Sequence, residues 1–137
     1  MKFVVSFACV LLIAGAAVAQ TPRGASTGVY SKAQAARGKA VYSDSCSSCH
    51  GDALEGADVI PPLSGTRFLG NWKGQPVGDL AARIRTTMPA DNPGTLGQTA
   101  SAEITAYLLE ANGYPAGDAD LPTGNQPLSQ IVIDGSK

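Results

Sequence analysis

Glycine and proline limit what this chain can fold into. Its 137 residues include 16 glycines and 9 prolines, a combined share well above the roughly 12% of average proteins. Hydrophobic residues make up 44% of the chain, which is enough for a packed core and too much for a disordered chain. These counts predict one domain built from short elements that are joined by long loops.

The charge balance argues against one class of function. Only 15% of the residues are charged, and the 10 Lys and Arg residues face 11 Asp and Glu residues, for a formal net charge of −1. A protein that binds nucleic acid by neutralising phosphates needs a surplus of basic residues. We therefore expect no nucleic-acid partner.

The first 19 residues have the pattern of a secretory signal peptide. Lys2 precedes an apolar run over residues 3–18, and Ala17-Val18-Ala19 supplies a small-x-small cleavage site. A retained membrane anchor is the alternative, but the run is shorter than the roughly 20 residues that span a bilayer. We expect residues 1–19 to be removed on export, which leaves a tether at 20–30, a folded domain at 31–114 and a C-terminal extension at 115–137.

Three short helices are expected in the folded domain. Residues 31–42 are rich in alanine, with Ser31 as a possible N-cap, and a second helix covers residues 79–86. The third begins at Thr99 or Ser101 and carries an apolar stripe of helical spacing. Residues 52–74 are expected to form a loop. Three such helices make a thin core, so something besides side chains is expected to fill the middle of the fold.

The residues Cys46-Ser47-Ser48-Cys49-His50 form a C-x-x-C-H motif, which is the attachment signature of c-type haem. Two thiols three positions apart can each form a thioether with one vinyl group of a porphyrin. The adjacent histidine then reaches the iron from the same side. The motif predicts one covalently bound haem c with His50 as an iron ligand.

Two other chemistries use a similar pair of cysteines. A thioredoxin-like redox pair expects a surrounding βαβ pattern, and the sequence shows none. A structural zinc site needs four Cys or His ligands, whereas residues 20–137 contain only three such side chains. Haem attachment therefore explains the motif best.

Met88 is the candidate for the second axial ligand. It is the only methionine after residue 19, and it precedes Pro89 in a loop that follows a short helix, where a side chain can project inward. A lone methionine can also be a core filler. Ligation by His50 and Met88 would raise the reduction potential relative to ligation by two nitrogens.

From about residue 31 to residue 113, the chain resembles the class I c-type cytochromes, which are small monohaem electron carriers. The resemblance implies an all-α, cytochrome c-like fold of three to four short helices around a covalently bound haem. It places Cys46 and Cys49 at the thioether positions, His50 at the proximal ligand and Met88 at the distal one. Pro61, the first residue of a Pro-Pro pair, matches the proline whose carbonyl accepts a hydrogen bond from the proximal imidazole.

Two finer features also resemble members of this class. Gly38 and Tyr107 match a contact between the first and last helices, in which a glycine lets an aromatic ring lie against the backbone. The surroundings of Met88 and the tail after Asn112 resemble cytochrome subunits or domains that serve periplasmic dehydrogenases, including quinoprotein alcohol dehydrogenases and sulfur-oxidising enzymes.

The resemblance implies electron transfer in the periplasm rather than catalysis. The expected partners are a dehydrogenase as electron donor and a terminal oxidase or another cytochrome as acceptor, with no membrane span after signal cleavage. One alternative is a haem enzyme or gas sensor whose distal site is open. Another is a fixed cytochrome subunit of one dehydrogenase, in which the apolar residues 131–133 either clamp onto the partner or fold back on their own domain.

Overall fold

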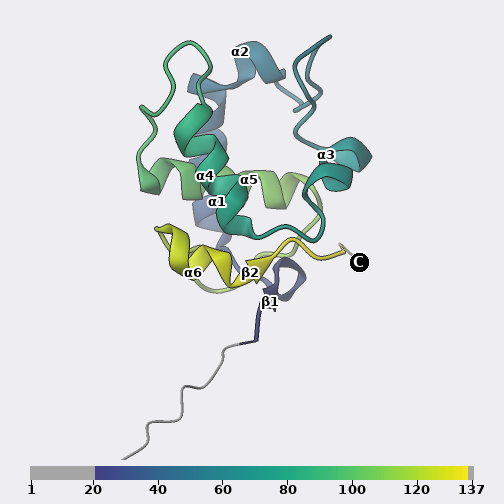
Figure 1. Ribbon diagram of the computed structural model, residues 1–137, viewed down its shortest axis with the longest axis vertical. Helices are drawn as coiled ribbons and strands as arrows, with labels where there is room; N and C mark the ends of the chain where they lie inside the picture. Colours follow the sequence, from purple (N-terminus) through teal and green to yellow (C-terminus); the bar gives the residue numbers. More distant parts are fainter. Residues whose placement is uncertain (1–20, 136–137) are drawn as a thin grey trace, which may run out of the picture.

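A computed structural model describes residues 21–135 as a mainly helical domain (Figure 1). The expected signal peptide, residues 1–19, lies outside this range. In chain order the elements are β1 (Arg23–Gly24), the 3₁₀ helix η1 (Ala25–Thr27), α1 (Lys32–Ser45), α2 (Ser47–His50), α3 (Gly65–Trp72), α4 (Val77–Thr87), α5 (Gln98–Ala111), α6 (Asn125–Ser129) and β2 (Ile131–Val132). The predicted all-α class is confirmed, with more helices than the sequence suggested. Between residues 21 and 135, no helix combines the length and the apolar character that crossing a membrane requires.

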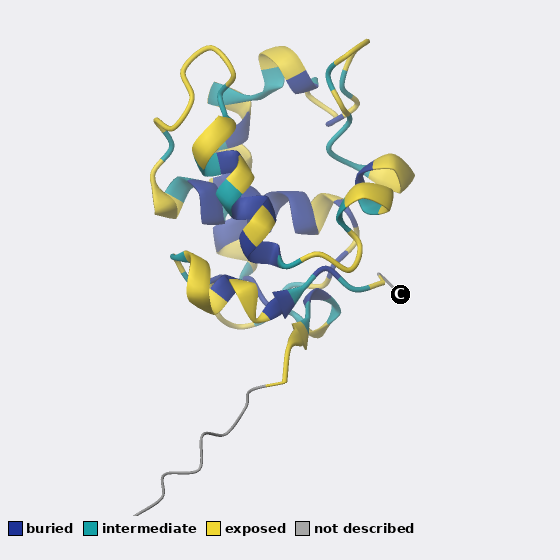
Figure 2. Cartoon of the chain, in the orientation of Figure 1, coloured by how far each residue is buried: buried dark blue, intermediate teal, exposed yellow. Residues whose placement is uncertain are grey.

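Helix α5 forms the centre of the core. Apart from Glu103, all of its residues from 101 to 109 are buried, and Figure 2 shows buried positions gathered where α5 meets α1 and α4. The start of α5 differs from the expectation, because its N-cap is Gly97 and no side chain caps it. The Ser101 hydroxyl instead donates to the carbonyl of Gln98 at 3.0 Å, which is a common local use of serine inside a first turn.

The predicted close approach between α1 and α5 at Gly38 is present. A Cβ at Gly38 would collide with the backbone carbonyl of Glu103 on α5. The ring of Tyr107 packs on that of Tyr42, with ring centroids 5.4 Å apart. Gly38 therefore lets the backbones of α1 and α5 approach each other, and the aromatic contact lies one turn further along α1.

Residues 52–74, expected to be a loop, contain helix α3. Gly65 and Gly70 lower the intrinsic helix propensity of this segment. Burial compensates for them, because Phe68 is only 1% exposed and its ring packs near that of Trp72, with centroids 6.4 Å apart. Tertiary packing thus overrides a weak local preference here.

Both ends of the described chain pack on the domain. Strands β1 and β2 pair in parallel, with Arg23 opposite Ile131 and Gly24 opposite Val132. The segment expected to be a tether contains three buried residues, Ala25, Val29 and Tyr30. It is held in place because its backbone bonds to a strand that lies more than 100 residues away.

The C-terminal segment, which we define as residues 115–135, folds back on its own domain. Leu121, Leu128, Ile131 and Ile133 are all buried. The side-chain amide of Gln34 on α1 donates to the carbonyl of Leu121 at 3.0 Å and accepts from its N–H at 2.6 Å. The apolar patch at residues 131–133 is therefore part of the core, which removes the reason for expecting it to clamp onto a partner.

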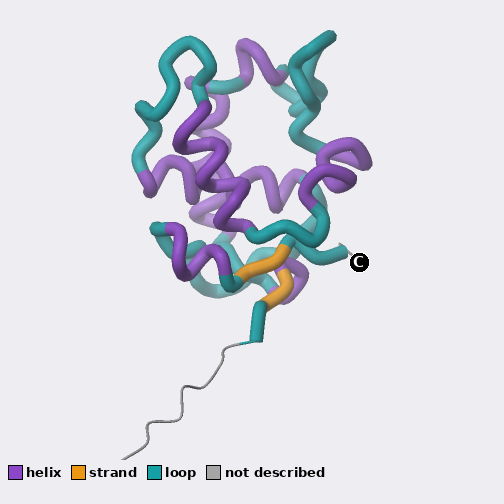
Figure 3. The backbone as a smooth tube through the Cα atoms, viewed as in Figure 1, coloured by secondary structure: helices purple, strands orange, loops and turns teal. Residues whose placement is uncertain are grey.

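Loops dominate the other end of the molecule. Figure 3 shows long loop segments between α2 and α3 and between α4 and α5, on the side of the domain away from β1 and β2. The packed core is concentrated toward β1 and β2, whereas the opposite end consists of α2, these loops and the end of α4.

Candidate haem site

A cavity of about 980 Å³ lies at the loop-rich end of the domain. This is at the upper end of the range for ligand pockets. Its lining includes every site residue expected from the sequence, namely Cys46, Cys49, His50, Pro61 and Met88. Apolar side chains from α3, α4, α5 and the preceding loop make up much of the remaining wall, among them Leu63, Phe68, Leu80, Ile84, Ile104 and Leu108.

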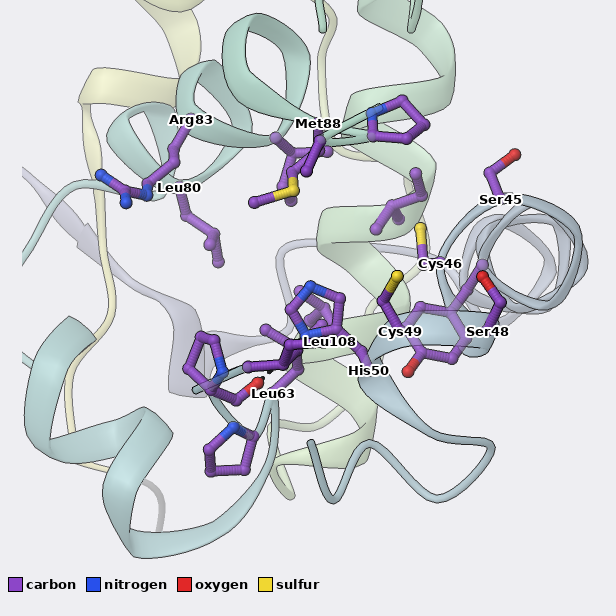
Figure 4. Close-up of a pocket in the computed structure, with 18 of the residues that line it drawn as sticks. Ser45, Cys46, Ser48, Cys49, His50, Leu63, Leu80, Arg83, Met88 and Leu108 are labelled. Carbon is purple, nitrogen blue, oxygen red and sulfur yellow. Dashed lines mark hydrogen bonds between the residues drawn. The ribbon is translucent and has the colours of Figure 1, made fainter. Parts of the chain in front are cut away.

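A break between α1 and α2 places the two thiols. Cys46 ends α1 and also begins α2, with φ −131° and ψ −33°, so the helix changes direction there. Cys46 is half-buried, Cys49 is exposed, and neither forms a disulfide. Figure 4 shows both sulfur atoms at the same edge of the cavity. Burial, and next the neighbouring Cys49, raise the pKa of the Cys46 thiol, so the protonated thiol is favoured at neutral pH.

A hydrogen bond to the backbone holds the His50 ring in one orientation. It is 8% exposed, and its Nδ1 atom lies 3.0 Å from the carbonyl oxygen of Pro61. Because a carbonyl only accepts, Nδ1 must carry the proton, and the lone pair is then on Nε2. Such a bond also increases the basicity of a ligating imidazole.

The loop that carries Pro61 is folded tightly against α2. Its backbone returns to the helix through a hydrogen bond from the Gly56 N–H to the His50 carbonyl at 2.8 Å. The Tyr42 hydroxyl donates to the Gly51 carbonyl at 2.6 Å. Burial, and next the nearby Cys46, raise the pKa of Tyr42, so this hydroxyl remains a donor. The position of the Pro61 carbonyl is thus set by bonds at several points of the loop.

Asn112 is a supporting residue that the sequence reasoning missed. Its side-chain amide donates to the carbonyls of Leu63 and Leu108 at 3.0 and 2.8 Å, and its Oδ1 accepts from the Gly65 N–H at 3.0 Å. Asn112 thereby ties the end of α5 to the chain just after Pro61. The only local signal was an asparagine beside Gly113 at a helix end, which predicts a cap and not a clamp.

Met88 faces the histidine from the other wall. It is the residue that ends α4, its backbone is extended at φ −120° and ψ 154°, and its side chain is half-buried. Figure 4 shows Met88 and His50 on opposite sides of the cavity, with the two cysteines at its edge. The geometry thus brings together residues that stand 38 positions apart in the chain.

One of the charged side chains that line the cavity is Arg83. It comes from α4 beside Leu80, on the side that lies away from Cys46 and Cys49 (Figure 4). The ion pairs within residues 21–135 both involve Arg37, so Arg83 has no carboxylate partner in that part of the chain.

The donor set fits a covalently held haem. It offers two unpaired thiols, one oriented imidazole and one thioether around a largely apolar cavity. In the described part of the chain, no group of three or more His, Cys, Asp and Glu side chains could hold a bare metal ion. Soft sulfur and imidazole ligands without carboxylates suit haem iron and not a hard cation.

The fold and the site together define a monohaem class I c-type cytochrome. Residues 33–108, more than half of the chain, match the protein family described as cytochrome c oxidase, cbb3-type, subunit III. The chain therefore belongs to this family of c-type cytochrome domains, and its cofactor is a covalent c-type haem. This confirms the cytochrome c-like fold that the resemblance implied.

The chain is also similar to two known proteins. The chain is 32% identical over 80 residues to a thiosulfate dehydrogenase from Stutzerimonas stutzeri (strain A1501), an alignment that covers 53% of this chain and 26% of the relative. It is also similar to the crystal structure of the sulfane dehydrogenase SoxCD from Paracoccus pantotrophus, with a TM-score of 0.56 and 27% identity. That match covers 76% of this chain and 53% of the solved chain. The chain thus spans about a quarter to a half of the length of these relatives.

Proposed function

We propose that this chain is a periplasmic electron carrier whose haem is bound through thioethers to Cys46 and Cys49 and ligated by His50 and Met88. The observation that carries the proposal is the opposition of His50 and Met88 across one apolar cavity, with two free thiols at its edge. The bound haem supplies an iron that takes one electron from a donor, becoming ferrous, and returns it to an acceptor.

The chain's own residues keep the site rigid. The Pro61 carbonyl prevents the His50 ring from turning, and Asn112 holds the backbone on which Pro61 lies. His50 and Met88 would both hold the iron, which would leave no ligand position for a substrate and would make electron transfer the role of the haem. Apolar side chains of α4 and α5 line the cavity and exclude water. Few solvent dipoles would therefore have to reorient when the haem gains or loses an electron.

Arg83 is placed to pair with a haem carboxylate. Cys46 and Cys49 would hold a haem through its vinyl groups, and the propionates of that haem would supply carboxylates that need a cationic partner. Arg83 lines the cavity on the side away from the cysteines, and guanidinium–carboxylate pairs are strong and directional. In this arrangement Arg83 balances negative charge that the chain itself does not neutralise.

The partners are redox proteins that dock transiently at the cysteine edge. Cys49 is exposed there, and small interfaces suit transient electron-transfer encounters. The two relatives are named as dehydrogenases of thiosulfate and sulfane sulfur, which favours a sulfur-compound dehydrogenase as the donor. A terminal oxidase or a second cytochrome would be the acceptor.

Two measurements on the purified holoprotein test the proposed ligation. The ferric protein is expected to show the near-infrared band of methionine-sulfur-to-iron charge transfer, and Met88→Ala is expected to lose it. Thr87→Ala, which changes the exposed last residue of α4 beside Met88, serves as the control and should keep the band. Rapid carbon monoxide binding to the reduced native protein would instead indicate an open distal site, as in a haem enzyme or gas sensor.

A further inference from the structure

We propose that the C-terminal segment, residues 115–135, is a positioning element for Met88. It packs against the first turn of α4 and thereby limits how far Met88, at the other end of that helix, can move away from His50. This inference rests on the proposed ligation by His50 and Met88, and it concerns residues that lie outside the cavity.

Helix α4 is the element that carries the Met88 wall. Met88 follows its last residue directly, and Leu80, Arg83 and Ile84 of the same helix line the cavity. His50 and the cysteines are carried by α2, which continues from α1. A shift of α4 relative to α1 therefore changes the separation of Met88 and His50 without breaking any bond to the cysteines.

The first turn of α4 is packed directly against α6. Helix α4 lies between α5 and α6, and Gly78 is the point of closest approach. A Cβ on Gly78 would be 3.0 Å from the backbone nitrogen of Ser129 and 3.2 Å from the carbonyl carbon of Leu128. Backbone is thus set against backbone at this point, so α6 limits where α4 can lie.

The strand that follows α6 secures the connection between α3 and α4. The Ile133 N–H donates to the Gln75 carbonyl at 2.9 Å, and the Gly74 N–H donates to the Ile133 carbonyl at 2.7 Å. Pro76, the N-cap of α4, pairs with Val132. The Ile133 side chain is fully buried. Both α3 and α4 are therefore anchored at the point where they meet.

The segment is itself fixed to parts of the domain that do not line the cavity. The Asp134 carboxylate accepts from the Ser26 N–H at 2.9 Å and from its hydroxyl at 2.5 Å, and the Tyr114 hydroxyl donates to the Asp134 carbonyl. None of residues 115–135 is among those that line the cavity. The segment consequently acts on the site through α4 and not by contact.

This arrangement predicts that Met88 ligation can be weakened without loss of the fold. Loosening the C-terminal segment should weaken Met88 ligation while the haem stays covalently attached and the α1–α5 core stays folded. A segment with a purely structural role would instead affect ligation only through loss of the whole fold.

The test compares three variants of the holoprotein with the native protein. One ends after Tyr114, the second is Ile133→Ala, and the control is Gln126→Ala, whose side chain is exposed on α6. Ferric near-infrared spectra report Met88 ligation, carbon monoxide binding to the ferrous protein reports how often the sulfur leaves the iron, and far-ultraviolet circular dichroism reports helix content.

We expect the truncated chain to lose the near-infrared band. We expect Ile133→Ala to bind carbon monoxide about tenfold faster than the native protein, which corresponds to about 1.4 kcal/mol. Gln126→Ala should match the native protein.

The inference is overturned if Ile133→Ala keeps the native band and native carbon monoxide rate. It is equally overturned if the helix content of Ile133→Ala falls in proportion to the band, because the effect would then be global. If the truncated chain does not fold, Ile133→Ala alone decides. If the native protein itself lacks the near-infrared band, the proposed ligation by Met88 is wrong. If the native protein and the variants all keep the band, the ligation stands and only the role of the C-terminal segment is wrong.

Discussion

The Nδ1 atom of His50 lies 3.0 Å from the carbonyl oxygen of Pro61. This bond joins the two ends of the loop after α2 and leaves Nε2 as the nitrogen with a free lone pair. The loop does not maintain the bond alone, because Asn112 at the end of α5 holds the backbone on either side of Ser64. The orientation of the imidazole therefore depends on a residue 62 positions away in the chain.

Asn112→Ala should destabilise the protein. The change leaves the Gly65 N–H and the Leu63 carbonyl without their partner, and an unsatisfied buried polar group costs about 1–3 kcal/mol. The free energy of unfolding is expected to fall by about that amount in urea titrations. Asn125→Ala, at an exposed position on α6, is the control and should change the unfolding midpoint little. Equal stability of the two variants would mean that Asn112 does not act as a clamp.

Gly38→Ala should destabilise the protein, although alanine favours helix more than glycine does. An added methyl group would collide with the Glu103 carbonyl of α5, which is backbone and cannot turn away. Overpacking of this kind costs about 1–3 kcal/mol or more, against a gain of about 1 kcal/mol in helix propensity.

Gly70→Ala provides the matched comparison in helix α3. Nothing lies within 4 Å of a Cβ at that position, so the propensity gain should remain and thermal unfolding should occur at the same or a higher temperature. If both variants unfolded at the native temperature, the close crossing of α1 and α5 would not be a constraint on stability.

Arg83→Ala should lower the midpoint potential of the haem. Removing a positive charge from the cavity wall favours the ferric state, which carries one more positive charge than the ferrous state. A shift of tens of millivolts is expected in a spectroelectrochemical titration. Arg85 on the same helix does not line the cavity, so Arg85→Ala should shift the potential less. The reverse order would exclude Arg83 as the partner of a haem carboxylate.

Asp120 should contribute stability that is lost in acid. Hydrogen bonds from Ser31 and then from Arg37 lower the pKa of its carboxyl. In the unfolded chain this group titrates near pH 4, so its contribution is complete above about pH 4 and disappears as the pH falls through the lower folded pKa. Urea midpoints of the native protein and Asp120→Asn are expected to differ at pH 7 and to converge as the pH falls below the lowered folded pKa. Asp118→Asn, which changes an exposed carboxylate of the same segment, should not show that convergence.

Local sequence patterns predict most of the candidate site residues. The C-x-x-C-H spacing is confined to a single turn, so it predicts which side chains attach a haem wherever that turn lies. Ser31 was expected to cap α1, and its side chain accepts from the Gln34 N–H at 3.0 Å. Helix α3 could not be predicted in this way, because burial of Phe68 outweighs two glycines and no local pattern records that burial.

Residue types and short spacings therefore defined the chemistry that this chain can perform. A chain whose residues 20–137 contain two cysteines, one histidine and one methionine has few ligand sets from which to choose. How those residues meet depended on contacts between distant segments. The Asn112 clamp and the bonds between Ile133 and the segment just before α4 involve backbone groups. Every residue carries a backbone carbonyl, and every residue except proline carries a backbone N–H. Their pairing with distant groups therefore leaves no local pattern in the sequence and appears only once the chain is folded.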